Sequence, residues 1–163
     1  MVDVVDPATR SRMMAGIRSK DTLPELFIRK GLHALGFRYR LHDRVIPGKP
    51  DLVFPKYGAL IDVRGCFWHG HDCEYFKSPS TNAEFWARKV AENRKRDARN
   101  LKAQSEAGWR SLIVWECAVR KAGKFSEEFT LIPAIAQWLS ESSHCATIDL
   151  HGLHESSHVY RHC

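Results

Sequence analysis

Residues 60–73, LIDVRGCFWHGHDC, constrain this chain more than any other stretch, because they join an apolar segment to charged, aromatic and metal-binding side chains. Residues 59–63 are apolar and partly β-branched and follow a Pro-Lys-Tyr-Gly turn, so we expect a short buried strand there. Alternate side chains of a strand share a face. Asp62 and Arg64 are therefore expected on one face of it.

Three metal-binding side chains follow within eight positions, those of Cys66, His71 and Cys73. Two thiolates and an imidazole suit tetrahedral zinc better than magnesium or calcium. A fourth ligand has to come from elsewhere in the chain. If a metal pins this loop, Phe67 and Trp68 cannot both turn inward, so at least one of them is expected to face a partner.

The 163 residues are enough for one domain with its own hydrophobic core. No apolar run approaches the ~20 residues that span a bilayer, and the first residues lack the apolar stretch of a signal peptide. We therefore expect a cytoplasmic protein without membrane contact. Thiols stay reduced in that compartment, so the five cysteines favour metal ligands plus spare thiols over a disulfide framework.

The formal net charge of +6 and the pI near 9.2 favour a polyanionic partner, although charge alone is weak evidence for one. Seven Lys and Arg residues crowd into residues 88–102, directly after Phe85-Trp86. This segment is either a nucleic-acid contact or a solvated helix face.

Hydrophobic periodicity predicts the order helix, three strands, helix, strand, helix, which is typical of an α/β fold with a mixed sheet flanked by helices. Residues 1–20 form either a short amphipathic helix or a basic arm. Residues 141–163 are rich in Ser and His, so we expect a flexible tail in which Cys145 and Cys163 are spare thiols. The expected helices and strands cover, in chain order, residues 22–35, 37–41, 50–54, 59–63, 83–107, 110–116 and 126–139.

Two carboxylates are expected to meet at one end of the sheet. Asp51 begins one strand and Asp62 lies near the end of the next, and antiparallel pairing across a short turn brings such positions together. Neighbouring carboxylates repel unless a cation lies between them, so this pair predicts a magnesium site. Glu25 forms a capping box with Thr22, and we weigh that role against a second one near an active site.

The helix expected over residues 83–107 carries an apolar stripe through Trp86. Asn93 and Asp97 fall on the same stripe at helical spacing. Polar side chains in such a place need partners.

Pro50-Asp51, followed after ten residues by Asp62-Val63-Arg64, matches the PD-(D/E)xK pattern of restriction-endonuclease-like nucleases, with Arg in place of Lys. With GCFWHGHDC directly after it, the chain resembles the Vsr family, the very-short-patch-repair endonucleases that nick DNA beside a T:G mismatch. The resemblance spans residues 6–120. It also includes ATRSRMM, PGKPDLVF, Phe85-Trp86, Arg96-Asp97 and GWRSLIVWECA.

This resemblance implies a role for each matching residue. Asp51 would bind catalytic magnesium together with the backbone carbonyl of Val63, and His69 would activate the attacking water. Residues 1–20 would embrace the DNA from the minor-groove side, ahead of an endonuclease domain over residues 21–140. The remaining roles would fall to Asp97 and Glu25 as catalytic support, to Cys66, His71, Cys73 and Cys117 as ligands of structural zinc, and to Phe67, Trp68, Trp86, Met14, Arg10 and Arg12 at the duplex.

The function implied by the resemblance is magnesium-dependent nicking of one DNA strand beside a T:G mismatch, which counters deamination of 5-methylcytosine. Double-stranded DNA with such a mismatch would be the partner of a monomer at the nucleoid of a prokaryote, alone or with other mismatch-repair proteins. Two other functions stay open. One is a restriction-type endonuclease without a mismatch requirement, and the other is a zinc-stapled DNA-binding module without cleavage.

Two positions depart from the family pattern. Family members often lack the second acidic residue and carry His where Arg64 stands. Asp62 is then either a magnesium ligand, which its spacing from Asp51 favours, or a salt-bridge partner. Arg64 would supply charge near the scissile phosphate without being able to act as a base.

Overall fold

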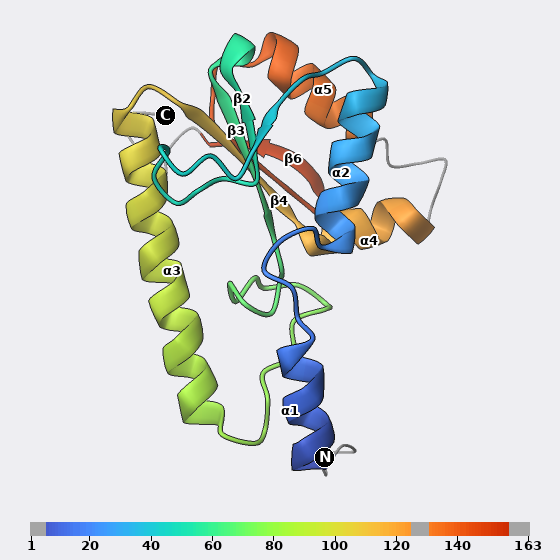
Figure 1. The fold of residues 1–163 in the computed structure, drawn as a ribbon, viewed down its shortest axis with the longest axis vertical. Coiled ribbons are helices and arrows are strands. Elements are labelled where there is room, and N and C mark those ends of the chain that lie inside the picture. The colour runs from blue at the N-terminus through green and yellow to red at the C-terminus, as the bar shows by residue number, and fades with distance from the viewer. Residues whose placement is uncertain (1–5, 125–130, 157–163) are drawn as a thin grey trace.

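The computed structural model describes residues 6–124 and 131–156. Figure 1 shows a central sheet with helices on both faces, which confirms the predicted mixed α/β architecture. The elements are, in chain order, α1 (Pro7–Ala15), α2 (Leu23–Ala34), β1 (Arg40–Leu41), β2 (Leu52–Phe54), the 3-10 turn η1 (Pro55–Tyr57), β3 (Ala59–Arg64), α3 (Ala83–Glu106), β4 (Arg110–Trp115), α4 (Glu116–Lys124), α5 (Leu131–Glu141), β5 (Ala146–Asp149) and β6 (Gly152–Glu155).

The six described strands form one sheet in the order β1 to β6. β1, β2 and β3 pair antiparallel, β3, β4 and β5 pair parallel, and β6 returns antiparallel to β5. A parallel pair needs a long crossover connection, and α3 lies within the connection between β3 and β4. Because β2 and β3 are antiparallel, the start of β2 lies beside the end of β3, from which the chain continues toward α3 (Figure 1).

Alternation along the strands divides the core between the two faces of the sheet. Leu52 and Phe54 of β2 belong to the large cluster that packs against α2, α4 and α5. Val53, between them, belongs to a smaller cluster on the other face, with Ile46 and Leu60. This period of two is what a strand buried on both faces requires, and it fixes the register of β2 against β3.

The predicted elements before residue 116 are present, with ends that differ from the expected ones by up to three residues. The strand expected over residues 37–41 is only Arg40–Leu41, and the strand expected to end at residue 116 stops at Trp115, where α4 begins at once. The prediction missed α4, because this helix follows β4 directly, without a turn residue between them to mark its start. The last helix is described from Leu131, and residues 125–130 lie outside the described residues.

The prediction of a flexible tail is wrong for residues 146–155, which form β5 and β6 and complete the sheet. Ile148 is fully buried, so the segment contributes to the core. Cys145 is disulfide-bonded and is therefore not the spare thiol that we expected. Cys163 lies outside the described residues.

The N-terminal segment takes the helical alternative over residues 7–15. Asp6 caps α1 by accepting hydrogen bonds from the backbone N–H groups of Ala8 and Thr9. In Figure 1, α1 lies away from the sheet, on the same side as the first turns of α3 and the segment 65–82. Among the described helices, none is long and apolar enough to cross a membrane.

Candidate functional site

Asp51 and Asp62 meet where β2 begins and β3 nears its end. The pairing of Leu52 with Ile61 places them opposite each other, and the backbone N–H of Val63 donates to Asp51 Oδ2 at 2.7 Å. Burial, followed by the charge of Asp62, raises the pKa of Asp51 to about 7, and burial likewise raises the pKa of Asp62. The predicted proximity is confirmed, and the pair favours a bound cation.

Arg64 lies between two carboxylates and is itself buried. One guanidinium nitrogen is 3.5 Å from Asp62 Oδ2, and the other is 3.6 Å from Asp97 Oδ2. Asp62 and Arg64 therefore share one face of β3, as predicted. Because Arg64 keeps its charge at any physiological pH, it places a fixed positive charge beside the carboxylates.

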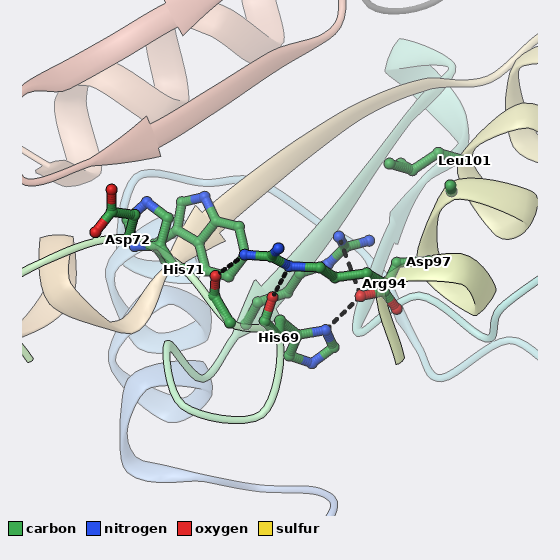
Figure 2. A pocket seen from close by; sticks show the side chains of 10 residues that line it. His69, His71, Asp72, Arg94, Asp97 and Leu101 are labelled. Atoms are coloured by element: carbon green, nitrogen blue, oxygen red, sulfur yellow. Dashed lines mark hydrogen bonds and ion pairs between the residues drawn. The ribbon is translucent and has the colours of Figure 1, made fainter. Parts of the chain in front are cut away.

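His69 and Asp97 form a close pair, seen at the centre of Figure 2. His69 Nδ1 lies 2.5 Å from Asp97 Oδ2. Burial alone would raise the pKa of Asp97, but the hydrogen bond with His69 and the charge of Arg64 outweigh it and lower that pKa. Asp97 is thus a carboxylate that fixes the imidazole, and Nε2 is the nitrogen left to accept a proton. The partner that sequence analysis required for Asp97 is His69.

Glu25 lies in the first turn of α2, and its side chain also faces His42, a neighbour of Asp51. Thr22 caps α2 and accepts from the Glu25 N–H at 3.4 Å, while Glu25 Oε1 lies 3.2 Å from His42 Nε2. The other nitrogen of His42 is 3.7 Å from Asp51 Oδ1. Sequence analysis missed His42. The pairing of Leu41 with Leu52 could have indicated it, because that register places His42 opposite Asp51. The His42 backbone N–H donates to the Asp51 carbonyl.

These acidic and imidazole groups open into one pocket of ≈ 400 Å³, which we call the carboxylate pocket. Its acidic centre suits a hard divalent cation, and the basic side chains around it suit a phosphate. Sequence analysis placed Lys20 and Arg96 in basic segments and did not single out Arg44 or Lys49. The pocket is lined by Asp51, Asp62, Arg64, His69, Asp97 and His42, with Lys20, Arg44, Lys49 and Arg96.

A second potential metal site is the Cys/His cluster of Cys66, His71, Cys73 and Cys117, whose ligand atoms all lie within 4.8 Å of one another. The three cysteines are free. His71 Nδ1 and Cys117 Sγ are 3.7 Å apart, close to the ~3.6 Å between tetrahedral nitrogen and sulfur ligands of zinc. The donor set and its spacing fit zinc, and Cys117 lies where the fourth ligand that residues 60–73 lack would be.

The Cys/His cluster rests on the C-terminal hairpin. The His71 ring stacks on Trp115 at 4.1 Å, and its Nε2 faces Asp149 Oδ2 of β5 at 4.0 Å. A hydrogen bond with Cys66 is the main cause that lowers the pKa of Cys117 to about 7, and one with the Leu150 backbone adds to it. Burial of the thiol acts in the opposite direction. The segment that we expected to be a tail thus contacts two of the four metal-binding residues.

Phe67, Trp68 and Trp86 gather into an aromatic cluster with Phe85. Ring centroids lie 5.2 Å apart for Phe67 and Trp86 and 5.8 Å apart for Trp68 and Trp86. Trp68 and Trp86 are half-buried, and Phe85 is exposed. Rings that are this close and still partly open to solvent form a stacking surface beside His69.

The other predicted DNA contacts lie on α1. Met14 is half-buried, and Arg12 is exposed and donates to Thr9. Arg10 is in α1, but its side chain is outside the described set. The structure leaves these residues apart from the carboxylate pocket, so their role stays a prediction.

Comparison with known proteins agrees with this geometry. The model of the family described as DNA mismatch endonuclease Vsr matches residues 2–75. The DNA mismatch endonuclease Vsr of Escherichia coli K12 is 42% identical over 154 residues, which cover 94% of this chain and 98% of that protein.

Two further relatives are named as nicking enzymes. The Type II nicking enzyme V.XorIIP of Xanthomonas oryzae pv. oryzae is 42% identical over 76% of this chain and 90% of its own length. The Type II nicking enzyme V.NmeAIP of Neisseria meningitidis is 40% identical over 74% of this chain and 86% of its own length. In all three cases the shared segment is most of the relative.

Proposed function

Because the chain belongs to the Vsr family of DNA mismatch endonucleases, we propose that it nicks one strand of duplex DNA beside a T:G mismatch in a magnesium-dependent reaction. The observation that carries this proposal is the hydrogen-bonded pair of His69 and Asp97 in the same pocket as Asp51 and Asp62. One pocket then contains both a base and a cation site, the two parts that phosphodiester hydrolysis needs.

Asp51 and the Val63 carbonyl hold magnesium in this proposal, and Asp62 is a further ligand. The raised pKa values of both aspartates support it, since burial and the neighbouring carboxylates outweigh the charge of Arg64 and a cation would restore the balance. When bound, the metal supplies the charge that neutralises the phosphate oxygens in the transition state. Glu25 and His42 support Asp51 from its other side.

His69 is the general base. Asp97 holds Nδ1, which orients the ring and leaves Nε2 to take a proton from the attacking water. The Asp97 carboxylate also stabilises the imidazolium that results. Arg64 is fixed between Asp62 and Asp97, so it brings a permanent positive charge to the phosphate without taking part in proton transfer.

Recognition of the mismatch is proposed to rest on the aromatic cluster. Phe67, Trp68 and Trp86 stack against an unstacked base step, which costs a few kcal/mol and least where pairing is already poor. Met14, Arg10 and Arg12 on α1 hold the duplex from the other side. Zinc in the Cys/His cluster keeps residues 66–73 in place, and the protein acts as a monomer at cytoplasmic DNA.

Nicking of matched and mismatched duplexes tests the proposal. Two duplexes of one sequence, with T:A or T:G at one position, are incubated with the protein and magnesium, and the nicked strand is mapped. Nicking of the T:G duplex beside the mismatch is expected, with none in EDTA and none by the His69→Gln variant. Equal cleavage of both duplexes would instead establish the restriction-type alternative, and binding without cleavage would establish the DNA-binding module.

A further inference from the structure

Two neighbouring residues of α3, Asn93 and Arg94, hold the backbone of the loop that carries Trp68 and His69. Asn93 Nδ2 donates to the Trp68 carbonyl at 2.8 Å, and Arg94 Nε donates to the His69 carbonyl at 3.2 Å. A second Arg94 nitrogen donates to the Gly70 carbonyl (Figure 2). Three consecutive carbonyl groups are therefore bound by one turn of one helix.

The loop has little room to move relative to that helix. Gly70 has a φ of +62°, a conformation that favours glycine, and a Cβ at this position would lie 2.4 Å from Val90 of α3. Within the loop, the His69 N–H donates to the Gly65 carbonyl and the His71 N–H to the Cys66 carbonyl. The backbone of residues 68–70 is thus fixed from both sides.

The two side chains on this backbone serve different parts of the proposed reaction. The Trp68 ring faces Trp86 at 5.8 Å, while His69 Nδ1 contacts Asp97 at 2.5 Å. Trp86 and Asp97 are both on α3, at positions that a rise of 1.5 Å per residue separates by about 16 Å. One helix therefore carries Trp86, which contacts the stacking residue Trp68, and about three turns later Asp97, which contacts the general base His69.

We propose that Asn93 and Arg94 are positioning residues that join the stacking surface and the general base into one unit. A base step seated on Trp68 then sets where His69 stands relative to the phosphate. The proposal rests on the proposed function and extends it from catalysis to specificity. Near-attack geometry is demanding, and a displacement of about 1 Å can cost ~10²-fold in rate.

Arg94 could instead contact a DNA phosphate, since its side chain is exposed. The two roles have different consequences. A phosphate contact contributes to affinity and to the salt dependence of binding, by about one unit of slope. A positioning residue acts on the rate of the bound complex and leaves both quantities unchanged.

Single-turnover nicking of the T:G duplex with excess protein separates these roles. For Arg94→Ala we expect a rate ~10- to 100-fold lower, with a dissociation constant and salt slope equal to those of the wild type. Arg94→Lys should not restore the rate, because one ammonium group cannot bind two adjacent carbonyls as the guanidinium fork does. Lys95→Ala is the matched control, since it removes the next cation of the same helix, and it should keep the wild-type rate.

Asn93→Ala should reproduce the loss of rate, but Asn93 is buried, so its thermal unfolding is compared with that of the wild type. The exposed Arg94 keeps the test decisive if Asn93→Ala unfolds. An Arg94→Ala protein with the wild-type rate would overturn the inference, and so would one whose whole defect lies in DNA affinity and salt slope.

A double-mutant cycle tests the link to Trp68. If the contacts of Asn93 and Arg94 link the position of the stacked base step to His69, Arg94→Ala should lower the nicking rate much less in a Trp68→Ala background than in the wild type. Losses that multiply independently would contradict the link. A wild-type protein that cuts matched and mismatched duplexes equally would contradict the proposed function. The inference could still be tested in that case, because the rates of the variants can be compared on either duplex.

Discussion

The carboxylate pocket and the Cys/His cluster both begin where β3 ends, but the fold affects the ionisation of their side chains differently. In the pocket, burial and mutual repulsion raise the pKa of Asp51 and Asp62 and so disfavour their charged forms. In the cluster, the hydrogen bond between two thiols lowers the pKa of Cys117 and raises that of Cys66, so the thiolate form is favoured at Cys117 and disfavoured at Cys66. The stability cost of the first region would be offset by a bound cation, and the second region would support the fold by holding a metal.

The largest expected effect is on catalysis. Asp51→Asn should lower the T:G nicking rate by ~10³-fold or more, the scale of losing a charge-stabilising group in a hydrolase. Binding of the T:G duplex should persist, because an aspartate adds nothing to the attraction for phosphates. Gel-shift and single-turnover assays measure the two quantities. Wild-type nicking by this variant would show that the pocket is not the metal site of the reaction.

Cys117→Ser should have the largest effect on stability. We expect the variant to bind less than one zinc per chain and to lose ~4 kcal/mol of folding free energy, the contribution of a ligand present at about a thousand times its dissociation constant. Metal analysis and urea denaturation provide the measurements. A wild-type protein purified without zinc, together with a silent substitution, would refute the four-ligand assignment.

The same Asp51→Asn change should stabilise the protein when magnesium is absent. A carboxyl group with a folded-state pKa above its unfolded value binds more protons when folded, so the wild type loses stability as pH rises from about 4 to about 7. Asn removes that loss. Relative to wild type, the variant should gain up to ~4 kcal/mol at pH 8 and only ~1 kcal/mol at pH 4.5, measured by denaturation at both pH values. Destabilisation at pH 8 would mean that Asp51 is not a strained carboxylate.

Asp62 decides how far the pocket departs from the family pattern. If Asp62 is a metal ligand, Asp62→Asn should slow nicking by ~10-fold and raise the magnesium concentration needed for half of the maximal rate. Superposition of its magnesium titration on that of the wild type would leave Asp62 as a salt-bridge partner of Arg64. Arg64→Lys should keep much of the activity and Arg64→Ala little, since the proposed role is charge.

The smallest expected effect concerns the support of the Cys/His cluster. Asp149 faces the His71 nitrogen that points away from Cys117, and partners of this kind commonly change metal affinity by about 10-fold or more. Asp149→Asn should therefore weaken zinc binding by ~10-fold in competition with a chromophoric chelator. Glu155→Gln, an exposed change of the same charge in the same hairpin whose side chain contacts Ser142 instead, is the control. Equal affinities in both variants would remove the hairpin from the zinc site.

Local sequence determined the parts of both regions that neighbouring residues build. The spacing of Cys66, His71 and Cys73 fixes three ligands in one loop, and the turn between β2 and β3 brings Asp51 beside Asp62. Helical spacing likewise placed the polar residues Asn93 and Asp97 on the buried side of α3, where each found a partner in the loop. These contacts follow from periods of 2 and 3.6 residues, which can be recognised in this sequence without the structure.

Only the tertiary structure decided the contacts between distant segments. β5 lies beside β4 through parallel pairing of Ile113 with Thr147, and no local pattern in a Ser- and His-rich segment indicates which strand it will join. Because of that pairing, the segment expected to be a tail packs against the Cys/His cluster and places Asp149 beside His71. Arg94 similarly looked like one more solvated cation of a basic helix. Its partners are backbone carbonyls, which carry no sequence signal, so its role emerges only from the packing of α3 against the loop.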